Sequence, residues 1–115
     1  MRKVRVIFSA DAQEVYAHLE QEAPESKKDK MILKALDKKV GIIKSNMHYG
    51  EPIAKNLIPS EYTTKYGITN LFWVELPQFW RMLYTLKNDE IEIIAFVLDV
   101  IDHPTYDKKF GYRKK

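Results

Sequence analysis

Basic, imidazole and phenol side chains gather in the C-terminal half of this 115-residue chain. Arg81 lies in an apolar stretch between Trp80 and Met82, and His103 and Tyr106 follow the most apolar segment of the sequence. Together they supply what metal-free cleavage of RNA requires. The 2′-hydroxyl group of the RNA is the nucleophile, and the protein must accept a proton, stabilise a pentavalent phosphorane and protonate the leaving 5′ oxygen. Arginine suits the bidentate phosphate contact, histidine suits proton transfer, and tyrosine suits base stacking or proton transfer.

Each of these three side chains also has a purely structural interpretation. Arg81 can pair with Glu75 or Glu92 on neighbouring strands, because opposite charges stabilise cross-strand pairs. His103 can cap the end of a strand, and Tyr106 can pack a terminal helix onto the sheet. The sequence leaves both interpretations open. The aromatic residues Trp73, Phe79 and Trp80 are expected in a core or an interface, and not stacked on bases.

A second set of basic residues is suited to contacts with the phosphates of a bound RNA strand. Five of the last eight residues are basic and none is acidic, whereas the net charge of the whole chain is only +3. A basic, aromatic segment of this kind is an electrostatic footprint for phosphate, and a solvated tail is the alternative. The candidate RNA-binding residues are Lys55, Lys65, Lys108, Lys109 and Arg113.

The sequence offers no pattern for a metal or a cofactor. The three histidines (His18, His48 and His103) are isolated from one another, and the chain contains no cysteine. There is no glycine-rich phosphate loop and no nucleophile elbow, and the chain has four glycines in all. We therefore expect neither a metal ion nor a cofactor.

Length and composition favour one small folded domain over residues 1–115. The chain is 45% hydrophobic and 30% charged, which supports a core and a well-solvated surface. Its longest apolar run, near Ile91 to Ile101, is interrupted by Glu92 and Asp99 and falls short of the roughly 20 residues that span a bilayer. We expect a soluble, cytoplasmic protein with no contact to a membrane.

The N-terminal half predicts a strand and a helical hairpin. Alternation over Lys3 to Phe8 indicates a strand, and Ser9 or Asp11 can cap the helix that follows, which runs to Ala23 with one apolar face. Ser26 begins a capping-box pattern, and a long helix is predicted from there to about Asn46. This second helix carries seven lysines, which either complement the acidic first helix or bind RNA or a ribosome.

The C-terminal half predicts an antiparallel meander. Three apolar segments separated by short turns read as strands at residues 71–76, 80–86 and 90–99, with the third in a central, buried position. A turn over residues 48–52 and a connecting segment after it precede them, and residues 105–110 are predicted to form a last short helix. The expected fold is α+β, with an N-terminal strand, an αα-hairpin, a three-strand meander and a short C-terminal helix.

Four motifs in this order resemble those of the RelE/ParE superfamily of toxins from type II toxin–antitoxin systems. The segment from Gly50 to Leu57 is similar to the family's Gly-x-Pro-x-Lys-x-Leu turn, and the segment from Trp80 to Tyr84 is similar to its Tyr-Arg-Leu-x-Tyr strand. The segment from Leu71 to Leu76 looks like the intervening strand. The segment from Ile94 to Tyr106 resembles the closing strand and its His-x-x-x-Tyr tail.

The resemblance implies a ribosome-dependent mRNA endonuclease that inhibits translation and is neutralised by a co-encoded antitoxin protein. Arg81 matches the phosphate-contacting arginine, Tyr106 the C-terminal aromatic residue, His103 the basic residue before it, and Lys55 the motif lysine. The chain departs from the pattern at Trp73 and Pro104, where arginines are usual. Two alternatives remain: an inhibitor of DNA gyrase, as in the ParE branch, or an inert relative that binds only RNA or its antitoxin.

Overall fold

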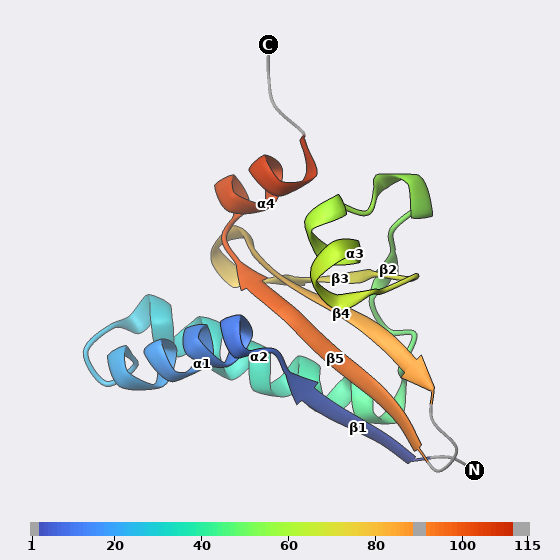
Figure 1. The fold of residues 1–115 in the computed structure, drawn as a ribbon. Helices are drawn as coiled ribbons and strands as arrows, with labels where there is room; N and C mark the ends of the chain where they lie inside the picture. Colours follow the sequence, from blue (N-terminus) through green and yellow to red (C-terminus); the bar gives the residue numbers. More distant parts are fainter. Residues whose placement is uncertain (1–2, 89–91, 112–115) are drawn as a thin grey trace.

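The computed structural model describes residues 3–88 and 92–111, and within them four α-helices and a mixed five-stranded sheet (Figure 1). The strand order is β1-β5-β4-β3-β2. The strands and helices in chain order are β1 (Lys3–Phe8), α1 (Ala10–Glu22), α2 (Lys27–Ser45), β2 (Glu51–Pro52), α3 (Ser60–Tyr66), β3 (Phe72–Leu76), β4 (Trp80–Asn88), β5 (Glu92–Ile101) and α4 (His103–Phe110), with 3₁₀ turns η1 (Lys55–Leu57) and η2 (Pro77–Phe79).

The sheet is antiparallel except at β1. That strand pairs in parallel with β5, and β5 also pairs with β4, so β5 has a neighbour on each side. The β3–β4 hairpin places Leu76 opposite Trp80 and Glu75 opposite Arg81. Because side chains alternate between the two faces along a strand, this register decides which side chains share a face.

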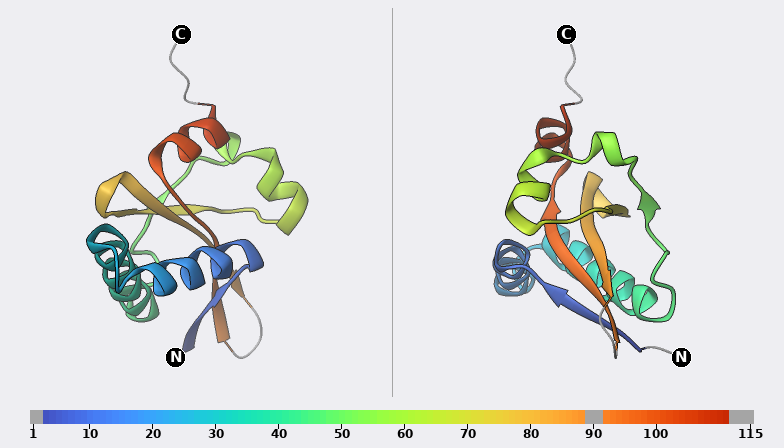
Figure 2. Two further views of the ribbon diagram at one scale, coloured as in Figure 1. Left: turned by 90° about the vertical axis from the view of Figure 1, so that its left-hand side faces the viewer. Right: turned by 45° about the vertical axis from the view of Figure 1, so that its right-hand side comes forward.

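Helices cover both faces of the sheet, and each face has its own core. The α1–α2 hairpin packs on one face, where Leu19, Leu36 and Ile43 meet Val74 and other buried strand residues. Helices α3 and α4 lie over the opposite face (Figures 1 and 2), where they form the second buried cluster. Its members are Tyr62, Ile68, Leu71, Leu83, Leu98, Ile101 and Tyr106.

Hydrogen bonds from short polar side chains fix where three of the helices begin. Ser9 Oγ accepts from the Ala12 N–H at 3.0 Å and donates to the Leu98 carbonyl oxygen at 2.7 Å, so it caps α1 and ties it to β5. Ser26 Oγ accepts from the Asp29 N–H at 3.2 Å at the start of α2. Asp102 caps α4 in the same way. These bonds satisfy amide groups that the first turn of a helix leaves unpaired.

The coarse α+β prediction is confirmed, and its details need two corrections. The predicted turn contains the short strand β2, which pairs with β3 and gives the sheet a fifth strand, and the connecting segment contains the helix α3. The last helix begins at His103 and not at Thr105. No helix in the described part of the chain is both long and apolar enough to cross a membrane.

Candidate functional site

Arg81 lies on the sheet face that α3 and α4 cover. Its guanidinium carbon is 4.2 Å from the ring centroid of Trp73 and 4.4 Å from the ring centroid of Tyr106. At these distances both rings attract the cation through their π faces. Arg81 is half-buried, so water screens this attraction less than at an open surface. The guanidinium is thus held between one ring from β3 and one ring from α4.

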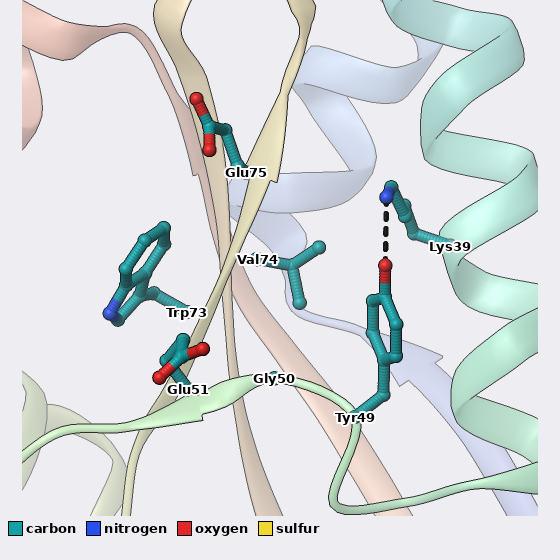
Figure 3. Close-up of a pocket in the computed structure, with 7 residues that line it drawn as sticks. All are labelled: Lys39, Tyr49, Gly50, Glu51, Trp73, Val74 and Glu75. Carbon is teal, nitrogen blue, oxygen red and sulfur yellow. Dashed lines mark hydrogen bonds between the residues drawn. The ribbon is translucent and has the colours of Figure 1, made fainter.

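The orientation of Trp73 follows from the alternation of side chains along β3. Figure 3 shows Trp73 and Glu75 on one side of the strand, with Val74 on the other side. Tyr49 lies on the side of Val74, where its hydroxyl oxygen accepts a hydrogen bond from Lys39 Nζ at 2.9 Å. Trp73 therefore projects away from the helical hairpin and towards Arg81.

Tyr106 is 3% exposed and its ring is covered on both faces. The ring of Phe110 stacks on it at a centroid distance of 4.3 Å and an interplanar angle of 17°. A guanidinium group and a second ring cannot share one face at these distances, so Arg81 and Phe110 occupy opposite faces. Tyr106 thus holds the arginine in place, and neither face of its ring is open to a base.

The N–H groups of the Arg81 guanidinium reach solvent. Within residues 3–88 and 92–111, Arg81 has no hydrogen bond or ion pair, and no buried side-chain nitrogen lacks a partner. Glu75 is opposite Arg81 in the register, yet no ion pair joins the two side chains in this part of the chain. Ile101 is opposite Arg81 on β5, which places Glu92 at the far end of that strand. A cation fixed in orientation with open donors can bind an oxyanion in a bidentate manner.

His103 is the first residue of α4 and lies one helical turn before Tyr106. Its Nδ1 is 3.3 Å from Asp107 Oδ2. Its ring makes an edge-to-face contact with Phe79, at a centroid distance of 6.2 Å and an interplanar angle of 71°. The side chain is 46% exposed. A carboxylate at this distance from Nδ1 favours one orientation of the imidazole, in which Nε2 is left for a substrate.

A buried hydrogen bond and a surface ion pair dock α4 against α3 and β5. Tyr62 donates a hydrogen bond to Asp99 Oδ2 at 2.6 Å, and Lys109 Nζ lies 2.6 Å from Glu61 Oε2 and 4.0 Å from Asp99 Oδ2. Burial raises the pKa of the Asp99 carboxyl group above its ordinary range. Burial, followed by the hydrogen bond to Asp99, raises the pKa of the Tyr62 phenol. These contacts hold α4, and with it Tyr106, against the sheet.

The predicted RNA-binding residues have different surroundings. Lys55 and Lys108 are exposed. Lys65 Nζ is 2.9 Å from Asp11 Oδ2, and Lys109 is bound to Glu61, so carboxylates engage both ammonium groups. Arg113 lies outside the described residues. No group of three or more potential metal ligands occurs in the described ranges.

Of the three predicted catalytic residues, the structure brings Arg81 and Tyr106 into contact and places His103 on the same helix as Tyr106. Phe79 was expected in a core or an interface and is exposed. Trp73 was expected there too, and it packs half-buried against the second buried cluster, but its contact with Arg81 was missed. Hairpin register was the signal that could have identified it. Across a three-residue connection, positions 73, 75 and 81 share one face of the sheet.

Comparison of the chain with family models, with curated proteins and with solved structures finds no match.

Proposed function

We propose that this chain is an RNA-cleaving toxin of the RelE/ParE type, which acts on mRNA on the ribosome and is neutralised by an antitoxin protein. The observation that carries the proposal is the guanidinium of Arg81, which lies 4.2 Å and 4.4 Å from two flanking rings with its N–H groups open to solvent. A phosphate group fits this arrangement because its oxygens accept hydrogen bonds from two guanidinium nitrogens at once.

The arrangement of the elements also supports the proposal. A helical hairpin covers one face, an N-terminal strand runs parallel to the central strand, and Arg81 and Tyr106 lie on the other face. The order of an N-terminal strand, a helical hairpin and an antiparallel meander is the one that the sequence predicts, and the sheet has one strand more than expected. Fold likeness alone does not carry an activity, so the proposal depends on the contacts of Arg81.

In the proposed reaction, Nε2 of His103 accepts the proton of the RNA 2′-hydroxyl group as the 2′ oxygen attacks the adjacent phosphorus. The bond from phosphorus to the 5′ oxygen breaks, and the leaving oxygen takes a proton from water. Arg81 stabilises the negative charge that builds up on the phosphoryl oxygens. Trp73 and Tyr106 are positioning residues, which fix the guanidinium before substrate binds and so reduce the cost of reorganisation.

Purified protein incubated with translating ribosomes tests the proposal, with mRNA ends mapped by primer extension. We expect cleavage by the wild type and a loss of about 100-fold or more in rate for Arg81→Ala, the scale of one lost oxyanion donor. Lys87→Ala is the matched control, because it removes an exposed cation at the other end of the same strand. Circular dichroism and thermal melts establish that both variants fold.

Intact mRNA with the wild type, together with normal growth when the protein is expressed, would refute the proposal. A gyrase supercoiling assay run in parallel identifies the ParE-like alternative, which requires inhibition of supercoiling without cleavage of mRNA. An unchanged cleavage rate for Arg81→Ala would refute the assignment of the phosphate contact while leaving the activity in place.

A further inference from the structure

The turn between β3 and β4 is strained. Gln78 has φ 61° and Phe79 has φ 63°, so two successive non-glycine residues adopt the left-handed conformation. This conformation brings the β-carbon close to a carbonyl oxygen, and residues other than glycine, asparagine and aspartate avoid it. Such strain persists where the surrounding structure enforces it, and it concentrates at binding sites.

The strained turn presents an aromatic ring to solvent. Phe79 is 73% exposed, more than any other large hydrophobic side chain in the described ranges. Exposure of a ring of this size forgoes the favourable transfer of its surface out of water. Phe79 is therefore unfavourable for stability on two counts, its backbone conformation and its exposure. A glycine at this position would relieve both.

Phe79 lines an open hollow of 490 Å³ between the turn, the start of α2 and the start of α4. The hollow combines an aromatic surface with a cation: the ring of His103 packs on Phe79, and Lys28 lies on the α2 side. The one carboxylate there, Asp102, accepts the Thr105 N–H, and this bond lowers its pKa. An aromatic surface beside cationic side chains is the arrangement that binds single-stranded nucleic acid, with a base on the ring and phosphates on the cations.

We propose that this hollow is a base-binding subsite, in which an unpaired base of the RNA strand stacks on Phe79 and Lys28 contacts a neighbouring phosphate. The inference rests on the proposed function and extends it from the scissile phosphate to an adjacent nucleotide. Phe79 lies two residues before Arg81 and packs on His103, which is one helical turn from the ring that holds Arg81. The hollow is thus connected to the proposed phosphate contact through His103 on α4 and through the first residues of β4.

A binding cycle tests the subsite without relying on cleavage. The probes are short, fluorescently labelled oligoribonucleotides with 2′-O-methyl riboses, which lack the nucleophile, and each carries one abasic position in turn. We expect Phe79→Ala to weaken binding of the intact oligonucleotide by about 10-fold, and Phe79→Trp to restore it. One abasic position should weaken binding to the wild type by a similar factor and should have no further effect on Phe79→Ala.

Two further variants separate a binding role from a structural one. Phe79→Gly should raise the Tm by about 4 °C, because glycine adopts a positive φ without strain, and yet bind RNA as weakly as Phe79→Ala. Tyr49→Ala is the matched control, because it truncates an exposed aromatic residue on the other side of β3 (Figure 3) and should bind like the wild type.

The subsite is overturned if the wild type binds none of the oligonucleotides, if Phe79→Ala binds them as the wild type does, or if the losses from Phe79→Ala and from every abasic position are additive. Self-association of the wild type that Phe79→Ala abolishes, with RNA binding unchanged, would assign the ring to a contact between copies of the chain. If the losses in RNA affinity are coupled but no mRNA is cleaved, the proposed function alone is refuted. If mRNA is cleaved but the losses are additive, the subsite alone is refuted.

Discussion

Replacing Trp73 by leucine and Arg81 by methionine, singly and together, should reveal a favourable interaction of about 1 kcal/mol between the two side chains. The guanidinium carbon lies 4.2 Å from the Trp73 ring centroid, within the range where a cation and a π face attract. Such contacts contribute about 0.5–1 kcal/mol when exposed and about 2 kcal/mol when dehydrated, and both side chains here are half-buried. We therefore expect an interaction free energy between the exposed and the dehydrated values.

Urea denaturation of the four proteins measures this interaction. Leucine retains an apolar side chain on β3 and methionine retains the unbranched stem of arginine. Arg81→Met also loses its contact with Tyr106, and Trp73→Leu loses part of its packing on the second buried cluster, and the double variant cancels both losses. The free energy of unfolding of the double variant, compared with the two single variants, isolates the pairwise contribution. Unchanged denaturant slopes would show that all four proteins expose the same surface on unfolding.

The matched control pairs Trp73→Leu with Lys87→Met. Lys87 is an exposed cation at the other end of β4, four residues beyond Leu83, which is the partner of Trp73 in the register. The two sites are more than about 10 Å apart along the strand, so their effects should add. A coupling between Trp73 and Arg81 below about 0.3 kcal/mol, within the usual error of additivity, would refute the view that the rings hold the guanidinium.

Four further variants test packing and buried charge elsewhere in the structure. Gly50→Ala should lower the free energy of unfolding by about 2 kcal/mol, because a β-carbon there would lie 2.9 Å from Cε1 of Tyr84. Gly41→Ala should raise the free energy of unfolding by about 0.5–1 kcal/mol, because Gly41 lies on an exposed part of α2 where a β-carbon would meet nothing within 4 Å. Urea midpoints compare this variant with Gly50→Ala. Tyr62→Phe should cost about 2 kcal/mol, or roughly 8 °C in Tm, because Asp99 loses its 2.6 Å hydrogen bond. Asp99→Asn should gain stability relative to the wild type as the pH rises from about 4 to about 7. Burial raises the pKa of Asp99, so the folded state binds the proton more tightly than the unfolded state and ionisation destabilises it. A difference in Tm that does not change with pH would contradict this.

Elements that bury a periodic face could be predicted from the sequence. The strand β1 was predicted with its observed bounds because its residues alternate, and α2 was predicted because Ser26 caps a helix whose apolar residues recur along one face. Helix α3 was missed because only Tyr62 of its seven residues is buried, so no periodicity marks it. The available signals were Pro59 before it and Gly67 after it, which ends the helix with φ 63°.

The site was predicted in part for the same physical reason. Arg81 was identified because a cation within an apolar strand needs an open face or a partner. Its contacts with Trp73 and Tyr106 depend on the register of a hairpin and on the docking of α4. That docking depends on a buried hydrogen bond from Tyr62 to Asp99 and a surface ion pair between Glu61 and Lys109, whose members are 37 and 48 residues apart in the sequence. Contacts over such separations leave no local pattern in the chain.

The strained turn connects the two proposed sites through the register that it sets. Three residues separate Leu76 from its partner Trp80, and this spacing puts Glu75 opposite Arg81, with Trp73 as a diagonal neighbour on the same face. Shifting the pairing by one residue would turn Arg81 towards the helical hairpin, because side chains alternate along a strand. The connection that exposes Phe79 is thus the one that places the guanidinium against Trp73. The conformational cost at Gln78 and Phe79 is therefore tied to both the phosphate contact and the base-binding hollow.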